Sequence, residues 1–298
     1  MPYVSALCRM VRPRDGHQKV VTVLEAYLDE SGIHEGAEVC LIGGYFAGAG
    51  QWKKCEKLWE RVLSEHDVPL EKFHAKDLVK CTGFFHGWSN GDSYSLQFAL
   101  AETVAQYKIY PVAQGVVVTD FFKLSLSERR FMTGAVLTPE GKLVDSGSPN
   151  RPYFAPFQPV IKRVLSYVSV GAKGHFFFGL DRAFSQYATG LYATLKNNGF
   201  YPRQYQGRFG DIAFPLAKET PALQAADLMV HVVYQDMLEK LHENRLGSMA
   251  KPSDLIRLLL NNRRHTDDVV YQDEHLMRET LKEIPIEQRG ELLREDLA

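Results

Sequence analysis

The chain has 298 residues, of which 45% are hydrophobic and 24% are charged, and its formal net charge is −1. This composition is typical of a soluble globular protein. The near-neutral charge gives no general basicity that would indicate a nucleic-acid partner, but it does not exclude a local basic groove. No run approaches the roughly 18 apolar residues of a membrane span, and the spacing of the cysteines indicates neither a zinc site nor a disulfide framework. We therefore expect a cytoplasmic protein.

The first half of the chain predicts a strand pair, a helical segment and a third strand. Val20–Asp29 is β-branched and apolar, and Val39–Ala47 follows it after a polar turn, so the two segments predict a hairpin. Apolar residues at spacings of three and four predict helices over 51–66 and 93–107. Ile109–Thr119 predicts the third strand.

The second half alternates between helices and strands. Pro159–Val170 predicts a helix, and Lys173–Asp181 predicts a short apolar strand that ends in an acid. Ser185–Asn198 predicts a helix that ends at an Asn-Gly stop signal. Gly207–Phe214 predicts another strand, and a long helix is expected from Pro221 onward.

Strands that first form a meander and then alternate with helices predict an α/β fold with a mixed sheet covered on both faces. The order of the elements is that of the ribonuclease H fold. We expect a single domain over residues 1–245, with insertions at about 50–107 and 120–150. Residues 246–298 are charged and helix-prone, and they predict a helical appendage or an oligomerisation arm.

Three acids stand where composition alone would not place them. Asp29 ends the first strand, and Asp181 ends the strand before the last strand–helix unit. Asp227 lies in the long C-terminal helix, four residues after Leu223, and so projects from nearly the same side as the apolar stripe. A carboxylate that faces a core is costly unless it is paired or binds a metal.

If the three acids converge, they form an oxygen-rich cage of negative charge that suits Mg²⁺ or Mn²⁺. Two such ions about 3.5–4 Å apart can activate a water and stabilise the leaving oxygen in phosphodiester cleavage. Glu30 is a candidate fourth ligand or base, but side chains alternate along a strand, so its membership requires the strand to break at Ser31-Gly32.

Structural alternatives stay open for each acid. Asp29 and Glu30 can belong to a solvated turn, and Asp181 can form a salt bridge with Arg182. Asp227 can pair with Arg182 or Lys218. His74 and His231 can equally be structural. A further set of side chains at spacings of four can form either a solvated helix face or a ridge that contacts phosphates: Lys72, Lys76 and Lys80.

Four segments resemble the bacterial domain of unknown function 3800 family. They are "YLDESG" at 27–32, "FHAKDL" at 73–78, "FFFGLDR" at 176–182 and "PALQAADLMV" at 221–230. The resemblance covers roughly residues 20 to 245. It implies a ribonuclease H-like fold and a metal-dependent nuclease activity, with these residues at the site: Asp29, Glu30, Asp181, Asp227 and, as their neighbour, Gln224.

The first hypothesis is therefore a magnesium- or manganese-dependent nuclease in which Asp29, Asp181 and Asp227 bind metal and Glu30 assists. His74, Gln224 and Lys218 are the candidate substrate contacts. The alternative is a non-catalytic ribonuclease H-like scaffold that binds nucleic acid or a protein partner. A third hypothesis is a small-molecule phosphoester hydrolase with residues 121–150 as a lid.

Overall fold

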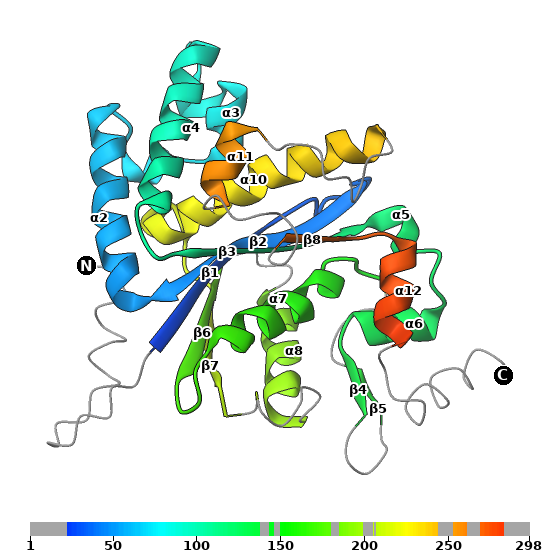
Figure 1. Ribbon diagram of the computed structural model, residues 1–298. Coiled ribbons are helices and arrows are strands. Elements are labelled where there is room, and N and C mark those ends of the chain that lie inside the picture. Colours follow the sequence, from blue (N-terminus) through cyan, green and yellow to red (C-terminus); the bar gives the residue numbers. More distant parts are fainter. Residues whose placement is uncertain are drawn as a thin grey trace, which may run out of the picture.

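The centre of the protein is a mixed six-stranded sheet with the strand order β7-β6-β1-β2-β3-β8 (Figure 1). The computed structural model describes residues 23–137, 143–145, 150–179, 185–198, 205, 207–243, 253–260 and 269–282. The strands of the sheet are β1 (Val23–Ser31), β2 (Val39–Gly48), β3 (Tyr110–Val117), β6 (Lys173–Phe178), β7 (Phe209–Ala213) and β8 (Val269–Gln272).

The strand directions follow from the connections between the strands. β1, β2 and β3 form an antiparallel meander, because short turns or helical segments return the chain beside its own start. β6 runs parallel to β1, and β7 runs parallel to β6. Such parallel pairs need helical crossovers, which α7 (Phe154–Tyr167) and α8 (Ser185–Asn198) supply. The predicted α/β fold with a mixed sheet is thus confirmed.

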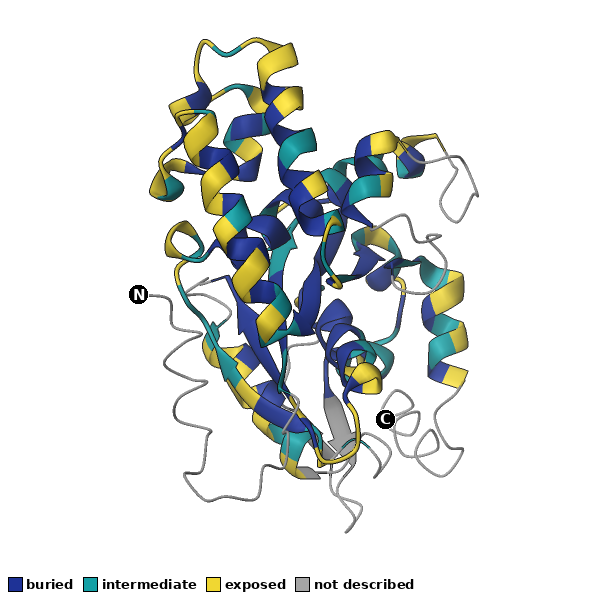
Figure 2. Cartoon of the chain, turned by 60° about the vertical axis from the view of Figure 1, so that its left-hand side comes forward, coloured by how far each residue is buried: buried dark blue, intermediate teal, exposed yellow. Residues whose placement is uncertain are grey.

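Helices cover both faces of the sheet, and a separate hydrophobic core lies on each face. α10 (Pro221–His242) packs on one face beneath α2 (Ala49–Glu65), α3 (Ala75–Lys80), α4 (Asn90–Ala105) and α11 (Asp254–Leu259). α7, α8 and α12 (Glu274–Lys282) lie on the other face. Figure 2 shows the buried residues along the sheet and the exposed ones on the outward sides of the helices.

The segment between β2 and β3 is helical, as expected. It comprises α2, the 3-10 turn η1 (Leu70–Lys72), α3, the 3-10 turn η2 (Gly83–Phe85) and α4. The second expected insertion also contains regular structure: α5 (Val118–Phe121), α6 (Leu126–Met132) and a small hairpin of β4 (Ala135–Leu137) and β5 (Leu143–Asp145).

The helix α7 begins at Phe154, five residues before the predicted start at Pro159. Proline has no N–H and usually breaks a helix interior. Here Pro159 lies inside the helix, and the buried side of the helix, which includes Phe157, Val160 and Ile161, holds this segment against the sheet.

α10 approaches the sheet closely because the facing residues are small. A Cβ atom at Gly44 in β2 would lie 3.0 Å from Cβ of Ala226 and 2.1 Å from the carbonyl oxygen of Tyr27. Gly44 also has a φ of +148°, which few other residues adopt. The helix residue that follows Ala226 is Asp227, so this close packing carries Asp227 to the sheet.

The C-terminal part of the chain belongs to the main sheet, so the predicted helical appendage over 246–298 is wrong in this respect. β8 pairs in parallel with β3, with Ala113 opposite Val269. The four-residue strand is too short to show a clear pattern in a charged segment.

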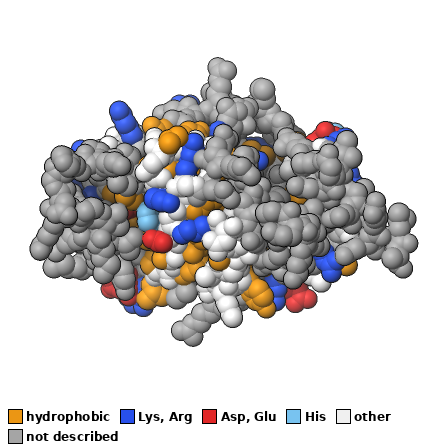
Figure 3. All heavy atoms as spheres, turned by 90° about the horizontal axis from the view of Figure 1, so that it is seen from below, with side chains coloured by type: hydrophobic (Ala, Val, Ile, Leu, Met, Phe, Trp, Pro, Cys, Tyr) orange, Lys and Arg blue, Asp and Glu red, His pale blue; other side chains and the backbone are white. Residues whose placement is uncertain are grey.

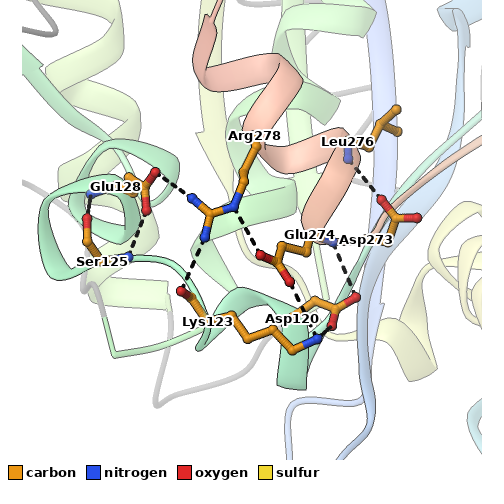
Figure 4. A network of polar contacts seen from close by, with 8 residues as sticks. All are labelled: Asp120, Lys123, Ser125, Glu128, Asp273, Glu274, Leu276 and Arg278. Atoms are coloured by element: carbon orange, nitrogen blue, oxygen red, sulfur yellow. Dashed lines mark hydrogen bonds and ion pairs between the residues drawn. The ribbon is translucent and has the colours of Figure 1, made fainter.

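A network of polar contacts holds α12 beside α5 and α6 (Figure 4). Arg278 donates to Oε1 of Glu128 at 2.9 Å and to Oε1 of Glu274 at 3.0 Å. The backbone N–H of Glu274 donates to Asp120, which also accepts from Nζ of Lys123 at 2.6 Å. These contacts join two segments that are far apart in the sequence.

Among the described helices, none has both the length and the apolar character needed to cross a bilayer. The face seen from below shows basic, acidic and hydrophobic side chains interspersed among its described residues (Figure 3). The described part of this face therefore carries side chains of both charges.

Candidate functional site

Asp29 lies near the end of β1, at the edge where the parallel strands β1 and β6 both end. Tyr27 belongs to the core under α10, and side chains alternate along a strand, so Asp29 points toward the same side. Its register partner on β2 is Gly43, which presents no side chain in front of it. The carboxylate of Asp29 is therefore directed at the helix α10.

Asp227 meets Asp29 from α10. Its Oδ2 accepts a hydrogen bond of 2.8 Å from the backbone N–H of Ala75, the first residue of α3. That N–H is one of the groups at a helix start that lack a partner within the helix. The bond fixes α3 to α10 and orients the Asp227 carboxylate.

The two carboxylates affect each other electrostatically. Burial raises the pKa of Asp29 well above its usual value, and the negative charge of Asp227 raises it further. Burial also raises the pKa of Asp227, while the hydrogen bond from Ala75 and the positive charge of His74 lower it. Two neighbouring acids of raised pKa form a place where added positive charge is favourable.

Gly179 lies beside Asp29 and leaves room for its carboxylate. Its N–H donates to the carbonyl of Leu28 at 3.0 Å, which extends the pairing of β6 with β1. A Cβ atom at Gly179 would lie 2.5 Å from Oδ1 of Asp29. The third predicted acid, Asp181, follows two residues later in the sequence and lies outside the described residues.

His74 is exposed and lies at the N-terminal end of α3. Its Nδ1 is 3.3 Å from Oδ2 of Asp77, one turn further along the same helix. The charges of His74 and Asp77 both act on the pKa of Asp227. His74 is thus brought beside the acid pair, as its candidate role as a substrate contact requires. Asp77 was not among the predicted residues, although the His-x-x-Asp spacing indicates such a pair.

Glu30 does not join the acid pair. β1 remains a regular strand through Ser31, with Glu30 opposite Ile42 in the register. Ile42 belongs to the core on the α7 face, and on that same face burial and then the charge of Glu30 raise the pKa of Cys40. The strand break that would turn Glu30 toward Asp29 is absent, so the expected assisting role does not fit this structure.

Gln224 also has a different role from the one expected. It is 1% exposed; its Oε1 accepts from the indole N–H of Trp59 at 3.0 Å, and its Nε2 donates to the carbonyl of Leu70 at 2.7 Å. Both ends of the amide are used inside the helical layer, which corrects the predicted substrate contact.

Lys218 lies in the exposed 3-10 turn η3 (Ala217–Glu219) that precedes α10. Within the described part of the chain, no hydrogen bond or ion pair joins it to Asp29 or Asp227. The predicted alternative of an ion pair between Lys218 and Asp227 is therefore not what the structure shows, and the turn does not place Lys218 as a contact of the acid pair.

His231 lies one helical turn after Asp227 and is buried. Burial, together with the charges of Lys80, His74 and Lys76, lowers its pKa to about 4. Positive side chains of α3 therefore lie near His231, which carries a neutral imidazole at neutral pH. Lys76 and Lys80 are both exposed.

The donor chemistry of the acid pair fits a hard divalent cation, because carboxylate oxygens are the preferred ligands of Mg²⁺ and Mn²⁺. Within the described ranges, no group of three or more His, Cys, Asp or Glu side chains has the arrangement of a metal site. Asp29 and Asp227 alone offer carboxylates for two ligands, so a bound cation would need a further ligand from elsewhere.

Compared with protein-family models, curated proteins and solved structures, the chain matches none.

Proposed function

We propose that the protein is a magnesium- or manganese-dependent phosphodiesterase that cleaves nucleic acid, built on a ribonuclease H-like fold. The observation that carries this proposal is the meeting of Asp29 and Asp227, two partly buried acids from distant parts of the sequence, at one edge of the sheet. A fold that buries two like charges side by side loses stability unless a cation offsets them.

The strand arrangement supports the proposed fold. An antiparallel meander of β1, β2 and β3 is followed by β6 and β7, both parallel to β1. The carboxyl ends of β1 and β6 lie at the edge that Asp29 occupies. Asp181 follows β6 in the sequence, and we propose it as the third ligand.

In this proposal, Asp29 and Asp227 hold the cation, and the N–H of Ala75 keeps the Asp227 carboxylate oriented toward it. The bound metal would lower the pKa of an attacking water and stabilise the leaving oxygen. His74 is exposed and beside the acids, so it is placed to bind a phosphate oxygen or to give a proton to the leaving group.

Exposed basic side chains favour a polyanionic substrate. Lys76 and Lys80 project from α3, and their charges reach His231, one turn from Asp227. Lysines beside the site can neutralise the phosphates that flank the cleaved bond.

A non-catalytic scaffold is the second candidate, and one observation favours it. The hydrogen bond from Ala75 already satisfies one oxygen of Asp227 without any metal. In a scaffold, the acid pair would serve only to attach α3 and α10 to the sheet.

A cleavage assay separates the two candidates. Wild-type protein is incubated with single- and double-stranded DNA and RNA in Mg²⁺ or Mn²⁺, beside the Asp29→Asn and Asp227→Asn variants. Asp254→Asn, which changes an exposed acid on α11, is the control. The proposal predicts metal-dependent cleavage by wild type and control only. Equal cleavage by all four proteins would contradict the site, and no cleavage by any would favour the scaffold.

A further inference from the structure

A cavity of about 400 Å³ lies between α10 and the outer helices α3, α4 and α11. Cavities that hold small molecules usually measure roughly 300–1,000 Å³. Its apolar walls come from Val79, Val232, Leu255 and Ile256. Neither Asp29 nor Asp227 lines it, so it is separate from the carboxylate site.

His231 is the residue that marks this cavity as a binding site. It lines the cavity, is 8% exposed, and its Nε2 is enclosed without a hydrogen-bond partner among the described residues. A buried polar atom without a partner destabilises the folded protein. This nitrogen has almost no accessible surface, so a ligand bonds it once the imidazole turns toward the cavity, and the bond then offsets that cost.

The charges in the cavity wall largely cancel. Nζ of Lys240 is 2.7 Å from Oδ2 of Asp236, and both side chains are largely buried. Glu239 is exposed on the same helix, so its charge is solvated. Because the buried charges of the wall already pair with each other, the cavity favours an uncharged ligand.

The polar groups of the wall are suited to a planar heterocycle. Gln97 and Gln235 contribute side-chain amides, and Nε2 of Gln97 donates to Oγ of Ser93 at 3.0 Å, which leaves its Oε1 as an acceptor. Amide and imidazole groups pair with the hydrogen-bonding edges of nucleobases. Aliphatic side chains can pack on the flat faces of such a ring.

We propose that this cavity binds a nucleobase, with His231 and the two glutamine amides bonding its edge. Asp227 and His231 are about 6 Å apart along the axis of α10, since each residue adds about 1.5 Å. A base in the cavity and a phosphate at the carboxylates can therefore belong to one strand. This last step rests on the proposed function, whereas binding of a free nucleoside does not.

Titration of the full-length protein with adenosine, guanosine, cytidine and uridine, in EDTA and followed by calorimetry, tests the proposal. We expect at least one nucleoside to bind. Val232→Trp, which fills the cavity, should weaken that binding at least tenfold, and His231→Phe, which keeps the ring but removes its nitrogens, should weaken it severalfold. Val170→Trp makes the same change at a site that is 89% exposed and should bind as wild type does.

The proposal is overturned if no nucleoside binds, or if His231→Phe and Val232→Trp bind as well as wild type. Circular dichroism and thermal unfolding show which variants are folded, and His231→Phe decides the question if Val232→Trp does not fold.

A competition experiment identifies the source of the base. An oligonucleotide that displaces the bound nucleoside, and does so less well when it carries an abasic residue, shows that the base comes from a strand. No displacement shows that the cavity serves a free nucleoside. These measurements need no metal and no cleavage, so they can succeed even where the proposed nuclease activity fails.

Discussion

The carboxylate of Asp29, near the end of β1, lies close to the carboxylate of Asp227 in α10. Burial raises the pKa of Asp29, and the charge of Asp227 raises it further. The approach depends on residues that keep side chains out of the way, namely Gly43, Gly44 and Gly179. The geometry of the acid pair is therefore set by backbone packing as much as by the acids themselves.

Gly179→Ala tests this packing. The added Cβ would lie 2.5 Å from Oδ1 of Asp29, so the carboxylate has to turn away. We expect metal-dependent cleavage to fall by about a hundredfold, because moving a catalytic group by about 1 Å can lower the rate by this factor. Gly190→Ala is the control, since a Cβ at that position in α8 meets nothing within 4 Å. Unchanged turnover by the Gly179 variant would show that Asp29 does not need its present position.

Gln224→Ala tests the structural role of Gln224. The change removes the partner of the Trp59 indole N–H and of the Leu70 carbonyl inside the helical layer. We expect a loss of about 2–4 kcal/mol in the free energy of unfolding, measured by urea denaturation. Gln106→Ala alters an exposed glutamine at the end of α4 and should change stability little. A stable Gln224→Ala variant with weakened substrate binding would instead restore the predicted substrate contact.

A second pair of acids predicts how stability depends on pH. Burial, together with the charge of Glu56, raises the pKa of Glu25 from 4.5 to about 7, and burial with the charge of Glu60 raises that of Glu56 to about 7. A bond from Tyr27 lowers the pKa of Glu25 in part.

Because the folded protein holds these protons more tightly than the unfolded chain does, stability should fall as the pH rises from 4.5 to about 7 and then level off. Glu25→Gln should thus stabilise the protein at pH 8 by an amount on the order of 3 kcal/mol and leave it unchanged near pH 4. Thermal unfolding across this pH range is the measurement, with Glu102→Gln, at an exposed position of α4, as the comparison. A gain of the same size at both pH values would refute the titration.

Arg278→Ala tests the attachment of the C-terminal segment. Arg278 bonds Glu128 and Glu274, and its removal should loosen α12 and, with it, the adjoining strand β8. We expect a loss of about 1 kcal/mol and faster hydrogen exchange in Val269–Gln272. Arg257→Ala, which breaks an exposed ion pair within α11, is the matched control. Equal exchange rates in the two variants would show that the network does not hold β8.

The parts of the fold that the sequence predicted are those with strong local patterns. The strand that carries Asp29 and the buried side of the helix that carries Asp227 follow from the spacing of apolar residues alone. β8 escaped prediction because it has only four residues and its pairing partner β3 is more than 150 residues earlier. Its apolar residues indicate a strand only once its pairing with β3 is known.

The site was predicted in part for the same reason. Asp29 and Asp227 carry a local signal, because an acid at a strand end or on an apolar helix stripe is unusual. Gln224 carries none, since its partner Trp59 is on another helix. The side on which Glu30 lies depended on whether β1 bends after it, and the hairpin register keeps the strand straight.

Calorimetric titration of the full-length wild-type protein with Mn²⁺, beside Asp29→Asn and Asp227→Asn, tests the metal site most directly. We predict that wild type binds Mn²⁺ and that each variant loses this binding while it remains folded, because each carboxylate supplies a ligand. Absence of binding to wild type at millimolar Mn²⁺, or undiminished binding to both variants, would contradict a metal site at Asp29 and Asp227.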